Sequence, residues 1–133
     1  MEASVNRFKK VLIVDDEFVD TFITKHLMLK CNFADVYILI DSSQDAYDYI
    51  SEELTLGSKL PELIFLDINM PMYNGFEILE KIETFVKMNN LNTRVFILSS
   101  SDNIDDIRKT KAFNCVEDYF VKPLNEEMLL NIK

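Results

Sequence analysis

Five short apolar runs rich in β-branched residues constrain the fold of this chain more than any other feature. They span residues 11–14, 36–40, 63–66, 95–98 and 119–121. The first four are apolar at every position, which is typical of strands in a parallel sheet whose two faces are both covered by helices. The sequence therefore predicts a buried parallel sheet.

The segments between these runs have the apolar spacing of helices. Between the first two runs, apolar residues recur at i, i+3, i+4 and i+8, at Val19, Phe22, Ile23 and Leu27. Further helices are predicted to begin near residues 43, 75, 105 and 125. The alternation predicts an α/β fold of five βα units with a doubly wound parallel sheet. One domain is expected over residues 1–133, with its core at about 9–130.

The composition of the chain excludes several classes of function. The formal net charge of −9 argues against nucleic-acid binding, because phosphate contacts need clustered basic residues. The two glycines, Gly57 and Gly75, are too few and too far apart for a GxxxxGK or GxGxxG loop. One His and two Cys cannot form a Cys₄ or Cys₂His₂ zinc site. A bound metal is therefore expected to be a hard cation with oxygen ligands.

Several features indicate a cytoplasmic protein. Cys31 and Cys115 are expected to be reduced, buried thiols, since a chain of this length needs no disulfide, although a disulfide between them stays an alternative. The apolar run at residues 11–14 follows basic residues but is too short for a signal sequence. No apolar stretch has the length that spans a bilayer. We therefore expect no membrane contact.

Polar residues follow the predicted strands at what would be one edge of the sheet. Ligands of such sheets bind beyond the carboxyl ends of the strands, where the strand order reverses. The residues at these ends are Asp15-Asp16, Asp41-Ser42-Ser43, Asp67, Ser99-Ser100-Ser101 and Lys122-Pro123. Each alone can be explained by helix capping or a turn, but four of the five ends offer chemistry that would converge on one pocket, and this convergence indicates a single site.

Three aspartates at this edge suit a magnesium-dependent phosphoryl site. Asp15, Asp16 and Asp67 would repel one another when ionised, and Mg²⁺ relieves such repulsion by binding carboxylates together with phosphate oxygens. Lys122 and a serine hydroxyl would then contact a phosphoryl oxygen. An aspartate in the middle of such a site can itself be the nucleophile and form an aspartyl phosphate.

The chain resembles the response regulator receiver domains of two-component signalling over about residues 9–130. The resemblance rests on four segments in the family's order and spacing: the first strand with its acid pair, the phosphoacceptor segment, the fourth strand with its Ser or Thr, and the fifth strand with Lys-Pro. In this chain they read VLIVDDE (11–17), DINMPMYNGFE (67–77), VFILSS (95–100) and YFVKP (119–123). The implied fold is flavodoxin-like, with strand order 2-1-3-4-5.

The resemblance implies a phosphoacceptor with a bound Mg²⁺. Asp67 would accept a phosphoryl group from a phosphohistidine of a sensor histidine kinase or a histidine phosphotransfer protein. The metal ligands would be Asp16 directly, Asp15 through water, Asp67 itself and the backbone carbonyl of Asn69. The domain would be regulatory rather than an enzyme, with slow autodephosphorylation at most.

The resemblance also implies a conformational switch. Lys122 would contact the phosphoryl group, and its peptide bond to Pro123 would be cis. Ser99 would move toward the phosphoryl oxygen, and Tyr119 would change rotamer with it. This two-state shift would alter the face of the fourth helix, fifth strand and fifth helix, where a downstream protein partner binds.

The chain departs from the family pattern at a few positions. Tyr73 and Asn74 stand where Met and Asp are commoner, and Ser99 replaces the frequent Thr. Only ten residues follow Pro123, so the last helix is expected to be short.

Two other functions stay open. A phosphohydrolase of the haloacid dehalogenase type also uses a strand-end Asp nucleophile with Mg²⁺, but it needs a second Asp two residues on, where this chain has Asn69. The other is a receiver that never turns over phosphate and serves as a binding module. Within the receiver interpretation, the domain could be a diffusible messenger, a relay or part of a longer protein.

Overall fold

Strands and helices alternate along the chain in the computed structural model, which describes residues 6–56, 60–72, 74–89 and 91–133. Tyr73, one of the departures from the family pattern, lies outside these residues. The elements are β1 (Phe8–Val14), α1 (Phe18–Lys30), β2 (Ala34–Ile40), α2 (Ser43–Leu56), β3 (Leu63–Asp67), α3 (Gly75–Asn89), β4 (Arg94–Ser99), α4 (Ile104–Lys111), β5 (Val116–Val121) and α5 (Glu126–Leu130). All five predicted strands are confirmed, and four of them begin earlier than their apolar runs.

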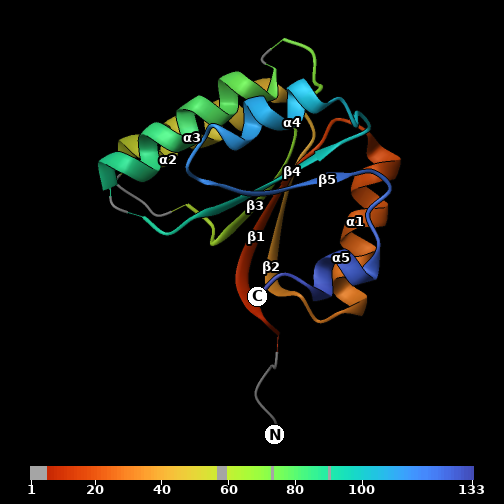
Figure 1. Cartoon of the computed structure of the whole chain (residues 1–133). Coiled ribbons are helices and arrows are strands. Elements are labelled where there is room, and N and C mark those ends of the chain that lie inside the picture. Colours follow the sequence, from red (N-terminus) through yellow and green to blue (C-terminus); the bar gives the residue numbers. More distant parts are fainter. Residues whose placement is uncertain (1–5, 57–59, 73, 90) are drawn as a thin grey trace, which may run out of the picture.

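The five strands form one parallel sheet in the order β2-β1-β3-β4-β5. Helices α2, α3 and α4 cover one face, and α1 and α5 cover the other (Figure 1). The predicted flavodoxin-like α/β fold is confirmed. The chain leaves β1 toward β2 on one side and later enters β3 on the other, so the strand order reverses between β1 and β3. Ligand sites of such sheets lie beyond the carboxyl ends of these two strands.

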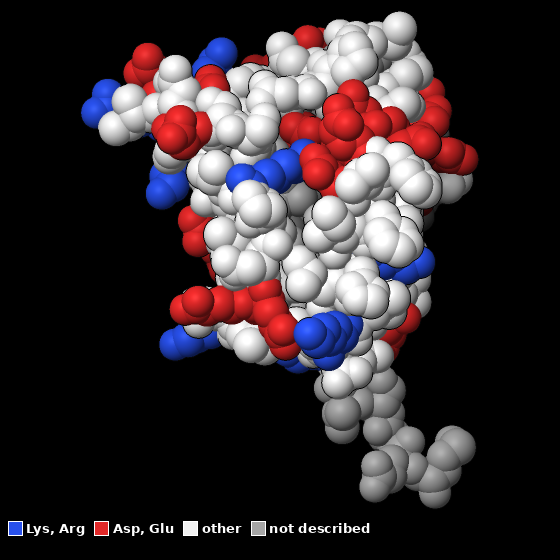
Figure 2. Space-filling view, turned by 90° about the vertical axis from the view of Figure 1, so that its right-hand side faces the viewer, with Lys and Arg blue, Asp and Glu red and all other residues white. Residues whose placement is uncertain are grey.

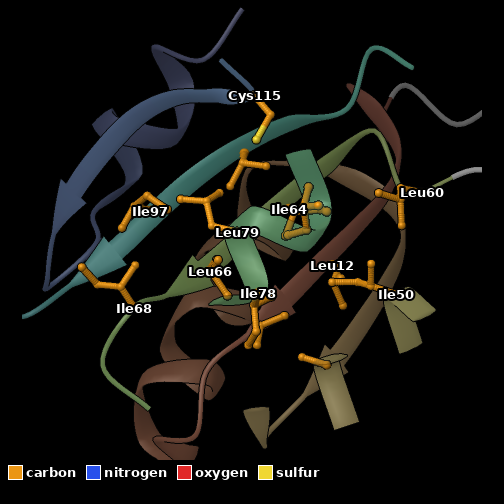
Figure 3. Packing of buried hydrophobic residues seen from close by; sticks show 14 of the residues in the cluster. Leu12, Ile50, Leu60, Ile64, Leu66, Ile68, Ile78, Leu79, Ile97 and Cys115 are labelled. Atoms are coloured by element: carbon orange, nitrogen blue, oxygen red, sulfur yellow. The ribbon is translucent and has the colours of Figure 1, made fainter. Parts of the chain in front are cut away.

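The main core lies between the sheet and the helices α2, α3 and α4. Strand residues such as Leu12, Ile64 and Ile97 point toward this layer and pack against helix residues such as Ile50 and Ile78 (Figure 3). All five are fully buried. The strands are apolar on both faces, so each face of the sheet must be covered. Burial of these residues removes apolar area from water and stabilises the fold.

A row of aromatic rings crosses the opposite face of the sheet. Phe33, Phe65, Phe96 and Phe120 lie in sequence, with neighbouring ring centroids 5.9, 5.1 and 5.8 Å apart. These distances lie in the range that aromatic pairs prefer. The row joins β3, β4 and β5 beneath the layer of α1 and α5, with Met28 and Leu129 in the same cluster.

Helix α1 forms as predicted, but the apolar stripe that predicted it does not face the core. Val19 and Phe22 are 65% and 64% exposed, and the buried residues of the helix are Thr24 and Met28. Helical spacing of apolar residues thus located the helix but not its buried side. Phe18, Phe22, Leu29 and Leu39 instead line an open cavity of about 470 Å³ between α1 and the end of β2.

Short polar residues begin the later helices. Ser42 Oγ accepts from the backbone N–H of Asp45, Asn103 Oδ1 from Asp105 and Asn125 Oδ1 from Met128. Each bond satisfies one of the free N–H groups at a helix start. Helix α5 spans only Glu126–Leu130, so the expectation of a short last helix is confirmed.

Neither cysteine is in a disulfide. Cys115 is buried, and burial raises the pKa of its thiol to about 12. Cys31 is partly exposed rather than buried as predicted, because it caps the end of α1 near the surface. Among the described residues, no helix combines the length and apolarity needed to cross a membrane.

Candidate functional site

The carboxyl ends of β1 and β3 bring three aspartates together. Asp15 directly follows β1 and Asp67 is the last residue of β3, and the register of Val14 with Leu66 sets them side by side. With Asp16, they offer ligand oxygens that all lie within 4.8 Å of one another. Figure 2 shows acidic side chains gathered near the top of the molecular face that carries α1 and α5. The predicted acidic cluster is therefore present.

Asp15 is held by one backbone hydrogen bond and one ion pair. Its Oδ1 accepts a hydrogen bond of 2.9 Å from the backbone N–H of Glu17. Its Oδ2 is buried without a hydrogen bond, although it lies 2.9 Å from Lys122 Nζ in an ion pair that lacks hydrogen-bond alignment. A buried oxygen of this kind is costly unless it is satisfied. It fits a ligand for a divalent cation.

Asp67 is buried and carries a strongly shifted pKa. Its burial raises the pKa of the carboxyl from 3.8 to about 6, although a hydrogen bond from the Asn69 N–H and the charge of Lys122 act in the opposite direction. The nearby Asp15 raises the pKa further. Removing a carboxylate from water disfavours its charged form, so a cation at this site would favour ionisation of Asp67.

Lys122 reaches the site from the end of β5. Its Nζ donates to Asp67 Oδ2 at 3.2 Å and to Asp20 Oδ2 at 3.0 Å. Burial alone would lower the pKa of Lys122, but its contacts with Asp15 and Asp20 and the charge of Asp67 outweigh that effect and raise it. The side chain therefore stays an ammonium group beside the oxygens of Asp67. The Lys122–Pro123 peptide bond is cis.

Ser99 and Tyr119 are joined through the loop that follows β4. Ser99 Oγ is buried and accepts hydrogen bonds from the Asn69 side-chain amide at 3.1 Å and from the Ser101 N–H at 3.0 Å. The hydroxyl of Tyr119 donates to the carbonyl of Ser101 at 2.8 Å. A continuous chain of hydrogen bonds thus runs from Asn69, in the loop after Asp67, to the Tyr119 side chain of β5.

Asp20 is the site residue that the sequence analysis missed. It lies in the first turn of α1 and accepts a hydrogen bond from Lys122, which is 102 positions away in the chain. An acid in the first turn of a helix is usually explained by the helix dipole, so the sequence alone gave no reason to assign it to the site. No local pattern could have identified it, because its contact with Lys122 depends on how α1 lies against the end of β5.

Comparisons with known proteins agree with this fold. Residues 11–132 match the family described as the response regulator receiver domain. A two-component response regulator from Cytophaga hutchinsonii superimposes with a TM-score of 0.82 at 27% identity, over 95% of this chain and 94% of that one. The receiver domain of the histidine kinase CKI1 from Arabidopsis thaliana, solved with Mg²⁺ and BeF₃⁻, gives 0.78 at 26%, over 93% and 87%.

Similarity extends to curated sequences. The chemotaxis protein CheY of Treponema pallidum is 28% identical over 121 residues, which are 91% of this chain and 77% of that protein. Several other relatives are longer proteins, of which this chain spans about half or less. The chain belongs to the response regulator receiver family of two-component signalling, whose members are regulatory phosphoacceptor domains.

Proposed function

We propose that Asp67 accepts a phosphoryl group from a phosphohistidine of a sensor histidine kinase or a histidine phosphotransfer protein. The observation that carries this proposal is the convergence of Asp15, Asp16, Asp67 and Lys122 at one edge of the sheet. In the transfer, a carboxylate oxygen of Asp67 forms a bond to phosphorus while the N–P bond of the donor breaks. The electron pair of that bond stays on the imidazole of the donor.

We propose that this reaction needs Mg²⁺. Asp16 would be the direct ligand, Asp15 would bind through water, and Asp67 and the backbone carbonyl of Asn69 would complete the set. Bound Mg²⁺ supplies positive charge to the phosphoryl oxygens. The clustered oxygens of the three aspartates and the raised pKa of Asp67 both support a cation here. Lys122 adds a second positive charge beside Asp67.

The output of the domain is a switch at Ser99 and Tyr119. Ser99 Oγ accepts two hydrogen bonds, so its own O–H is available to donate to a phosphoryl oxygen. Movement of Ser99 would weaken its bond with Ser101, to which Tyr119 is also bonded. The face formed by α4, β5 and α5 would then rearrange and bind a downstream protein partner.

We also propose that the domain signals in the cytoplasm. We further propose that it is not a hydrolase. At the position where a haloacid dehalogenase has its second Asp, the amide of Asn69 donates a hydrogen bond to Ser99 and is not acidic enough to serve as a general acid. This supports a phosphoryl group that is lost slowly rather than turned over rapidly. A binding module that is never phosphorylated is the remaining alternative, and the next experiment separates the two.

Intact-mass spectrometry after incubation with phosphoramidate tests the proposal. The wild type should gain one phosphoryl group when Mg²⁺ is present and none with EDTA, and Asp67→Asn should gain none under either condition. Asp48→Asn, which removes an exposed acid on α2, is the matched control and should react like the wild type. A wild type that stays unmodified in every condition would leave only the binding-module interpretation.

A further inference from the structure

Lys122 is shared among three carboxylates, and one of them lies outside the acidic cluster. Asp15 and Asp67 belong to the group of residues whose oxygens could hold a cation, and Asp20 does not. The distances from Lys122 Nζ to Oδ2 of Asp15, Asp20 and Asp67 are 2.9, 3.0 and 3.2 Å. Asp20 therefore binds Lys122 without being one of the candidate metal ligands.

A bound cation would leave the hydrogen bond between Lys122 and Asp20 in place. Asp15, Asp16 and Asp67 are the carboxylates that could serve as its ligands, and Asp20 lies outside this group. The Asp20 side chain approaches from α1 and is 40% exposed, whereas that of Lys122 is 14% exposed. One N–H of the Lys122 ammonium group can thus keep its hydrogen bond to Asp20. The other two N–H groups can then donate to Asp67 or to a phosphoryl group bound to it.

A lysine side chain needs a second contact of this kind to hold its ammonium group at one position. Its four-carbon stem is flexible and carries about 2 kcal/mol of rotamer entropy, and a hydrogen bond between charged groups is stronger than one between neutral groups. Fixing the ammonium group before the phosphoryl group arrives removes an entropic cost from that step.

We propose that Asp20 is a positioning residue that holds Lys122 against the phosphoacceptor oxygen of Asp67. The proposal rests on the proposed function, because it concerns how Lys122 meets a phosphoryl group. It makes the opposite prediction from simple charge repulsion, in which one more negative charge beside the site would hinder a dianionic ligand. Removal of Asp20 should therefore weaken the site rather than strengthen it.

The test measures binding of BeF₃⁻, a phosphoryl mimic, in the presence of Mg²⁺ by ¹⁹F NMR. Asp20→Ala should bind about tenfold more weakly than the wild type, in line with the loss of one charge-assisted hydrogen bond at a partly exposed position. Asp20→Asn keeps the shape and one acceptor oxygen and should lose about threefold. Asp48→Ala, an exposed acid on α2 away from the strand ends, should bind like the wild type.

A double-mutant cycle shows whether the effect passes through Lys122. In a Lys122→Ala background, Asp20→Ala should cause no further loss, because the group that it positions is gone. The Nζ–H signal of ¹⁵N-labelled Lys122 should also broaden in Asp20→Ala through faster exchange with water. A change in fold alone would produce neither result, and Asp20→Asn carries the test if Asp20→Ala does not fold.

The two proposals fail in different ways. If the wild type binds no BeF₃⁻, the proposed function fails and the role of Asp20 with it. If the wild type binds and Asp67→Asn does not, but Asp20→Ala binds as well as the wild type or more tightly, only the positioning role is wrong. An equal loss from Asp20→Ala with and without Lys122 would also overturn that role.

Discussion

The burial of Asp67 links the site to the pH dependence of folding. The pKa of this carboxyl rises from 3.8 to about 6 in the folded chain, chiefly because of desolvation. A raised carboxyl pKa stabilises the folded state at low pH, and this contribution is lost as the pH rises from about 4 through about 6. Ionised Asp67 is therefore a cost to the folded domain at neutral pH.

Asp67→Asn should remove this cost. We expect the variant to be more stable than the wild type at pH 7.5 by about 1–3 kcal/mol, and the difference to shrink toward zero near pH 4. Urea unfolding in the presence of EDTA at several pH values measures it, with Asp41→Asn as an exposed control. A difference that stays constant with pH, or that grows as the pH falls, would contradict the assigned cause.

At the scale of elements, the junction of β3 and α3 depends on close contact between two backbones. Gly75 begins α3, and its N–H donates to the carbonyl of Ile68 at 3.0 Å. A Cβ built on Gly75 would lie 2.2 Å from Cα of Ile68, a distance that only a shift of the backbone could relieve. Since Ile68 directly follows Asp67, this shift would also move the phosphoacceptor.

Gly75→Ala should therefore affect both stability and the site. We expect a loss of about 1–3 kcal/mol in the free energy of unfolding, as for other overpacked positions, together with slower uptake of phosphate from phosphoramidate. Glu80→Ala, on the exposed side of the same helix, should stay within about 0.5 kcal/mol of the wild type. Unchanged stability in Gly75→Ala would mean that the loop before α3 adapts without strain.

The loop between β4 and α4 is the element through which the switch should act. Addition of BeF₃⁻ and Mg²⁺ should shift the backbone NMR signals of Ser99 and Ser101 and those along α4 and β5, since Tyr119 is bonded to Ser101. Ser99→Ala should keep the shifts at Asp67 and lose most of those in α4 and β5. Shifts of equal extent in both proteins would rule out Ser99 as the link.

For the whole molecule, Mg²⁺ should act as a ligand of the folded state. Binding to the folded chain alone raises its stability by mass action, so 10 mM Mg²⁺ should increase the melting temperature by a few degrees at pH 7.5. The increase should be smaller at pH 5, because Asp67 binds a proton there. Asp16→Asn should lose most of it. An equal increase with NaCl of the same ionic strength would indicate screening instead.

The sequence by itself determined the α/β class, the five strands and the edge at which the site lies. Continuous apolar runs can only be buried between two layers of helices, and parallel strands place all their carboxyl ends together. Four spaced motifs were enough to identify the receiver family, as the match over residues 11–132 confirms. Asp15, Asp16 and Asp67 could be brought together in this way because each is fixed to the end of a strand.

Only the tertiary structure decided which side of each helix is buried and which distant side chains meet. The stripe of Val19 and Phe22 looked like a core face, yet α1 lies with Thr24 and Met28 inward, because spacing gives a helical period without its orientation on the sheet. The contact of Asp20 with Lys122 joins positions 102 residues apart. It depends on how α1 lies against the end of β5, and no local pattern in the sequence encodes that arrangement.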